Sequence, residues 1–136
     1  MLEQLKNWLR QFPGWGEEIL YVDYTDAQPG NVGLFSGGME ELERKTDILG
    51  GVTVRNRWSF TLRRVSAGQQ SNETDAVWLL DLQNWVQQQS VQGKAPVLGE
   101  NTRWRAEKGR LRDAAQTGTG VYTVNLIVEF TKIMEE

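Results

Sequence analysis

The stretch VTVRNRWSFTLRRV, residues 52–65, decides the fold of this chain because its side chains alternate between apolar and polar along most of its length. The residues that point one way are Val52, Val54, Trp58, Phe60 and Leu62, and those that point the other way are Thr53, Arg55, Arg57, Ser59, Thr61 and Arg63. A period of two is typical of a strand with one face on a core and the other in solvent. Residues 121–133 repeat this pattern. We therefore expect two long, central strands of one sheet.

Two segments on either side of the 52–65 strand have helical periodicity. Residues 2–12 place apolar side chains at helical spacing before Pro13-Gly14, which predicts a short amphipathic helix. Residues 72–92 predict a long helix that ends at Gly93. Its apolar side chains include Trp78, Leu82 and Trp85, which we expect to pack on the apolar side of the sheet.

The remaining segments are less regular. Residues 17–24 predict a strand, and residues 102–107 and 110–115 predict two shorter strands around Gly109. Residues 39–49 have a helix-forming composition, but Gly50-Gly51 and a long strand follow at once, so we favour a strand that forms a hairpin. Residues 25–38 are rich in glycine and predict a long, poorly ordered loop.

These elements predict a single α+β domain over residues 1–136. The fold class we expect is a two-layer sandwich, in which one mainly antiparallel sheet is covered by a short N-terminal helix and a long central helix. The chain is 39% hydrophobic and 24% charged, which is typical of a globular protein. The apolar runs are too short for a membrane span, and the charged N-terminal segment does not have the pattern of a signal peptide, so we expect no membrane partner.

The composition also bears on catalysis. The chain has no histidine and no cysteine, which excludes triads built on these residues, thiolate metal sites and disulfides. A catalytic site would have to use carboxylates, Lys, Tyr, Ser or Thr. The glycine-rich segments at 30–33 and 118–120 do not follow a strand and open a helix with the spacing of a nucleotide-binding loop. We therefore expect no cofactor and no metal, whereas enzymes without histidine and cysteine exist, so composition alone does not exclude catalysis.

Arginine is concentrated on the polar side of the 52–65 strand and in residues 103–112, whereas acids are concentrated at 39–47, 73–81 and the C-terminus. The basic side chains would suit a phosphate or an acidic protein surface. The alternative is a solvated sheet face in which arginine pairs with Glu and Thr across strands. The net charge is −3 and no nucleic-acid motif is present, so we favour the solvated face or a protein contact.

Dispersed apolar and glycine positions carry a resemblance to a known family. They are GGVTVRNR with FTL (50–57 and 60–62), WLLDLQNW with PVL (78–85 and 96–98), and GVYTV with EF (120–124 and 129–130). With the short N-terminal helix, they resemble the small minor capsid or tail-terminator-like proteins of tailed phages and prophages of Gram-positive bacteria.

That resemblance implies a non-enzymatic subunit that assembles into a hexameric ring and contacts tail-tube and head–tail connector proteins. It implies a location in the bacterial cytoplasm during assembly and then in the virion tail or a prophage-derived particle. The expected assembly interface combines the loop apolar residues with the arginines: Leu34, Phe35, Arg55, Arg57, Arg63, Arg103, Arg105, Arg110 and Arg112. The alternatives are a small nucleic-acid-binding module that uses the Arg-rich face of the sheet and a histidine-free enzyme of unknown chemistry. For the favoured function we expect no specific nucleic-acid partner.

Overall fold

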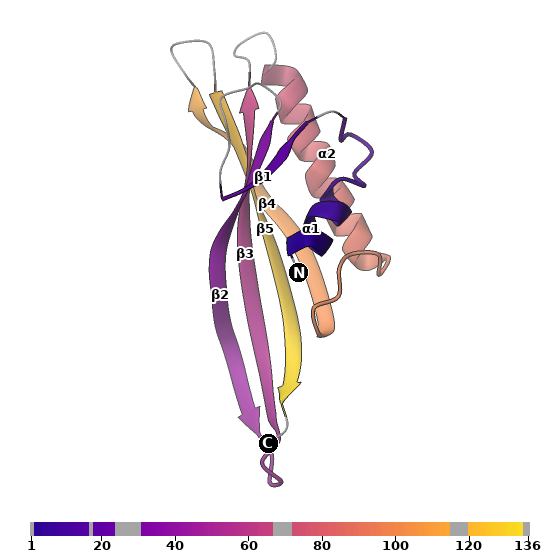
Figure 1. The fold of residues 1–136 in the computed structure, drawn as a ribbon, viewed down its shortest axis with the longest axis vertical. Coiled ribbons are helices and arrows are strands. Elements are labelled where there is room, and N and C mark those ends of the chain that lie inside the picture. Colours follow the sequence, from indigo (N-terminus) through magenta and orange to yellow (C-terminus); the bar gives the residue numbers. More distant parts are fainter. Residues whose placement is uncertain (1, 17, 24–30, 67–71, 115–119, 135–136) are drawn as a thin grey trace.

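The computed structural model describes residues 2–16, 18–23, 31–66, 72–114 and 120–134, with the backbone alone at 66, 72, 73, 108–114 and 120. Its elements, in chain order, are α1 (Leu2–Leu9), β1 (Leu20–Val22), β2 (Val32–Thr46), β3 (Val52–Ser66), α2 (Asn72–Val91), β4 (Glu100–Ala114) and β5 (Gly120–Met134). The five strands form one sheet in the order β1-β2-β3-β5-β4 (Figure 1). Strand β1 runs parallel to β2, and the other neighbours are antiparallel.

The alternation of the 52–65 segment is confirmed. In β3, Phe60 and Leu62 are buried, while Arg55, Arg57 and Arg63 at odd positions keep part of their surface in solvent. Strand β5 pairs with β3 without interruption from Gly120 to Met134, so the two patterned segments are long and lie in the interior of the sheet as predicted.

The helices pack on the apolar face through aromatic residues. Trp8 of α1 stacks on Trp85 of α2, with 5.2 Å between ring centroids, and lies 5.0 Å from Trp104 of β4. Helix α2 buries Leu82 and contacts β4 more extensively than β3 or β5. Trp78 is also buried, whereas Trp85 is only partly buried. The core therefore lies between the two helices and one end of the sheet, on the side of β4.

The predicted fold class is wrong. The structure is mostly a five-stranded mixed sheet, not a sheet covered by a short and a long helix. The physical reason is length: 15-residue strands span about 50 Å, whereas the 20-residue α2 spans about 30 Å. In addition, the parallel pairing of β1 with β2 makes the sheet mixed. Beyond the helices β2, β3 and β5 continue as a long arm, seen at the bottom of Figure 1.

Two local predictions were also wrong. Strand β2 begins at Val32, so much of the expected loop at 25–38 is strand, while residues 24–30 lie outside the described part. The preference for a strand at 39–49 is confirmed up to Thr46. Residues 100–114 form one strand, β4, because register shifts around Gly109 absorb the irregularity instead of ending the pairing.

The arm ends in a tight turn between β2 and β3. The Asp47 carboxylate accepts hydrogen bonds from the backbone N–H groups of Leu49, at 2.9 Å, and Gly51, at 2.8 Å. Gly50 takes a φ of 86°, a conformation that favours glycine. The side chains of Ile48 and Leu49 are fully exposed at this tip.

Candidate assembly surface

The face of the sheet that points away from the helices, here called the open face, carries most of the predicted arginines. Cross-strand pairing places Arg55 opposite Thr131, Arg57 opposite Glu129 and Arg63 opposite Thr123. On the next strand, Arg103 lies opposite the same Glu129. The topology thus brings together arginines from β3 and β4, which are separated in sequence by α2.

The arginines of the open face are held in cross-strand contacts. Arg57 lies 3.9 Å from Glu40 of β2 and 3.8 Å from Glu129 of β5. Arg105 donates to Glu129 at 2.8 Å and lies 3.6 Å from Glu107. These arginines therefore pair with acids across strands on a partly solvated sheet face. The sequence favoured this arrangement over a phosphate-binding face.

Two further arginines are also engaged. Arg55 donates through Nη1 to the Asn101 carbonyl at 2.9 Å and to the Thr131 hydroxyl at 3.0 Å, which links β3 to the start of β4 across β5. The Arg63 guanidinium lies 5.1 Å from the centroid of the Phe35 ring, a cation–π contact. These contacts hold the side chains in place and leave their outer surfaces in solvent.

Leu34 does not belong to an accessible interface. It is 1% exposed and packs in the core, because β2 carries it onto the helix side of the sheet. Phe35, the next residue, is partly exposed on the open face. Arg110 and Arg112 lie in β4, where Arg110 pairs with Thr123, but their side chains are outside the described part.

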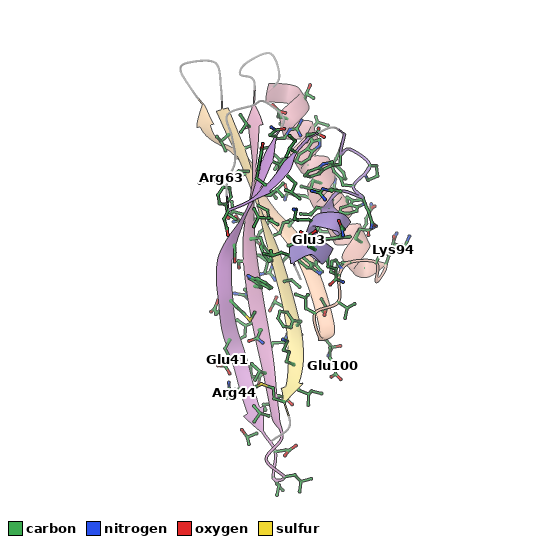
Figure 2. All side chains as sticks on the ribbon, viewed as in Figure 1. Glu3, Glu41, Arg44, Arg63, Lys94 and Glu100 are labelled. Atoms are coloured by element: carbon green, nitrogen blue, oxygen red, sulfur yellow. The ribbon has the colours of Figure 1, made fainter. Side chains whose placement is uncertain are left out.

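The outer side of β2 is the first of two contrasting flanks of the sheet. Past Ser36, β2 pairs only with β3 among the described strands. Glu40, Glu41 and Glu43 lie here with 67%, 44% and 60% of their side-chain surface exposed, and we call these three residues the acidic edge. Glu41 and Glu43 pair with Arg44 at 2.6 Å and Lys45 at 3.4 Å on the same strand, whereas Glu40 lies 3.9 Å from Arg57 of β3. Figure 2 shows Glu41 and Arg44 on this flank of the arm and Glu100 on the opposite side, where β4 begins.

The second flank is a groove of about 470 Å³ beside β4, which we call the basic groove. It is lined by Gln87, Ser90, Val91, Arg103, Trp104, Arg105 and Glu129. Arg103 is exposed there and has no ion-pair partner among the described side chains. Side chains of α2 form hydrogen bonds with two backbone groups of β4. The Ser90 hydroxyl accepts from the Trp104 N–H at 2.9 Å, and Gln83 donates to the Ala106 carbonyl at 3.4 Å.

A buried charged cluster lies on the helix side and was missed by sequence reasoning. Arg64 donates to Asp75 at 2.9 Å, lies 3.3 Å from Glu18 and stacks over the Trp78 ring at 4.3 Å. Arg64 is at an even position of β3, and the even positions of this strand face the core. This alternation was the sequence signal that could have predicted a buried arginine. The cluster joins β3, the start of α2 and the segment after α1.

Tyr122 lies beside this cluster. Burial raises the pKa of its phenol above 10.0, and the negative charge of Asp75 acts in the same direction. Across the described residues, no group of three or more His, Cys, Asp or Glu side chains could hold a metal ion. The described helices include none with the length and apolar character needed to cross a membrane.

Compared with models of known protein families and with curated protein sequences, the chain matches none.

Proposed function

We propose that this protein is a non-enzymatic structural subunit of a phage or prophage tail, of the tail-terminator or minor capsid type, that acts by assembling into a ring. The proposal rests on the family resemblance of the dispersed apolar and glycine positions and on the surfaces described above. Its partners would be further copies of itself, expected as a hexamer, together with tail-tube and head–tail connector proteins.

The observation that carries the proposal is the opposite character of the two flanks of the sheet. The acidic edge lies on β2 and the basic groove lies beside β4, with β3 and β5 between them. In a closed ring of identical subunits each contact is heterologous, so every subunit must present two different, complementary surfaces. Opposite charges on opposite flanks meet this requirement and fix the register of the contact more than its affinity.

The alternative of a nucleic-acid-binding module has less support. Arg57 and Arg105 lie in ion pairs with Glu40 and Glu129, so their charge is already partly compensated within the chain. A backbone-binding surface needs uncompensated Lys and Arg along one face.

The test is genetic. The gene would be removed from the phage or prophage that carries it, and heads, tails and joined particles would be counted by electron microscopy. We expect tails of irregular length that fail to join heads, with recovery when the wild-type gene is supplied. Normal, infectious particles formed without the protein would contradict the proposal.

A further inference from the structure

We infer that the subunits of this ring meet by placing the acidic edge of one copy against the basic groove of the next, with Glu40 opposite Arg103. The inference rests on the proposed function, because it names the two surfaces through which the ring would close. The occupant of the groove is therefore a second copy of this chain.

The first argument is a row of alternating charge that crosses the sheet. Strand pairing aligns Glu40 of β2 with Arg57 of β3, Arg57 with Glu129 of β5, and Glu129 with Arg103 of β4. This charge row therefore reads negative, positive, negative, positive, and its ends carry opposite signs. A neighbour placed beside β4 in the same orientation would continue the alternation with its own Glu40.

The second argument is that the register selects one acid of the edge. Glu43 aligns through Arg55 and Thr131 with Glu100, so a neighbour's Glu43 would face another carboxylate. Arg44 and Lys45 lie further toward the tip, beyond the level at which β4 begins. Lateral contact therefore brings Glu40 to a cation, while Arg44 and Lys45 are paired with Glu41 and Glu43 of their own strand.

The third argument is the relative direction of β2 and β4 and the backbone groups of β4 that α2 already binds. Within one chain β2 and β4 run antiparallel, since three antiparallel pairings separate them. A neighbour's β2 would thus approach β4 in antiparallel orientation. Because α2 already occupies the Trp104 N–H and the Ala106 carbonyl, the contact inferred here is made by side chains and not by these two backbone groups.

The groove also has an apolar component that suits the acidic edge. Val91 is 89% exposed on the helix side of the groove. Met39 precedes Glu40, lies on the helix side of the sheet opposite Trp58, and is 54% exposed. The same lateral placement therefore brings Met39 toward Val91 and Glu40 toward Arg103. One position of the neighbouring subunit thus satisfies both the apolar and the charged contact.

The experiment is a charge swap between two variants, Glu40→Arg and Arg103→Glu, with self-association measured by sedimentation velocity. Each variant alone brings like charges together at every joint, so we expect assembly at least about tenfold weaker than that of the wild type. In an equimolar mixture every joint between the two variants is again complementary, and we expect assembly to return. Glu43→Arg is the matched control on the same edge and should assemble at least as well as the wild type, because residue 43 would face Glu100 and not a cation.

The outcomes separate the two proposals. A wild type that never assembles contradicts the proposed function. Wild-type assembly that neither variant weakens, or that the mixture fails to restore, overturns the Glu40–Arg103 contact and leaves the ring standing. A Glu43→Arg variant that fails as Glu40→Arg does would also overturn the stated register. Circular dichroism checks folding. If a reversal unfolds the chain, Glu40→Gln and Arg103→Gln are measured singly instead, and each should weaken assembly, because each removes one charge of the contact at every joint.

Discussion

Arg64 and Asp75 form an ion pair from which water is almost fully excluded, with 9% and 6% of their side-chain surface exposed. Asp75→Ala removes a charged hydrogen bond from the buried Arg64, whose charge Glu18 at 3.3 Å continues to compensate in part. We expect this substitution to lower the free energy of unfolding by about 1.5–3 kcal/mol, measured by urea denaturation. The exposed Asp81 of the same helix is the control, and Asp81→Ala should change stability by about 0.5 kcal/mol or less. Equal effects of the two substitutions would contradict this account.

The phenol of Tyr122 should make the free energy of unfolding depend on pH in the alkaline range. Because burial and Asp75 raise the phenol's pKa above 10.0, the unfolded chain releases this proton at a lower pH than the folded protein does. The contribution of the neutral phenol to stability is thus complete below pH 10.0 and is lost as the pH rises through the folded-state pKa. We expect the free energy of unfolding of the wild type to fall more steeply over this range than that of Tyr122→Phe. Parallel pH profiles of the two proteins would argue against the assignment.

At the scale of elements, Trp8 is the largest of the three buried side chains of α1, the others being Leu5 and Leu9. Trp8 is 3% exposed, contacts Trp85 and Trp104, and donates to Gln89 at 3.2 Å. We expect Trp8→Ala to cost about 3–5 kcal/mol, the usual range for deleting a buried aromatic. Trp85→Ala should cost less, because Trp85 is only partly buried. Thermal or urea unfolding measures both, and the reverse order would show that α1 is not anchored through Trp8.

The turn at the end of the arm should depend on Asp47 and not on its apolar residues. Replacing both Ile48 and Leu49 by Ser should leave stability within about 0.5 kcal/mol, since both side chains are fully exposed. Asp47→Ala removes the acceptor of two backbone N–H groups and should cost about 1 kcal/mol. Urea denaturation of the folded subunit distinguishes the two, and a larger loss from the double Ser variant would contradict the exposed tip.

Elements with sustained periodicity could be predicted from the sequence. The alternation of 52–65 and 121–133 and the helical spacing of 72–92 each reflect a single buried face. The start of β2 could not be predicted in this way, because Gly33, Gly37 and Gly38 interrupt any apolar pattern. That segment is a strand because β1 and β3 pair with it on either side.

For the candidate surface, composition indicated which arginines belong to it but not their partners. The position of Glu40 beside Arg57 depends on a register shift in β2 between Ser36 and Met39. No sequence pattern predicts this shift. The alignment of Arg103 with Glu129 depends in the same way on the pairing of β4 with β5. Long-range strand pairing, and not local propensity, therefore sets the charge row.

At the scale of the whole molecule, the helices cover one end of the sheet and the other end extends as an arm (Figure 1). The two flanks of the sheet differ in charge. Helix α2 binds the Trp104 N–H and the Ala106 carbonyl of β4, whereas β2 past Ser36 pairs only with β3 among the described strands. A subunit with two unlike flanks suits head-to-tail contact around a ring and not a two-fold dimer, which would use one surface twice.

The central claim, assembly into a closed ring, is tested most directly by the mass of the purified wild-type protein in solution over a range of concentrations, with native mass spectrometry to count subunits. We predict one discrete oligomer, expected as a hexamer, that forms as the concentration rises and appears as a ring by electron microscopy. A protein that stays monomeric at every concentration, or that stops at a two-fold dimer, would contradict the account.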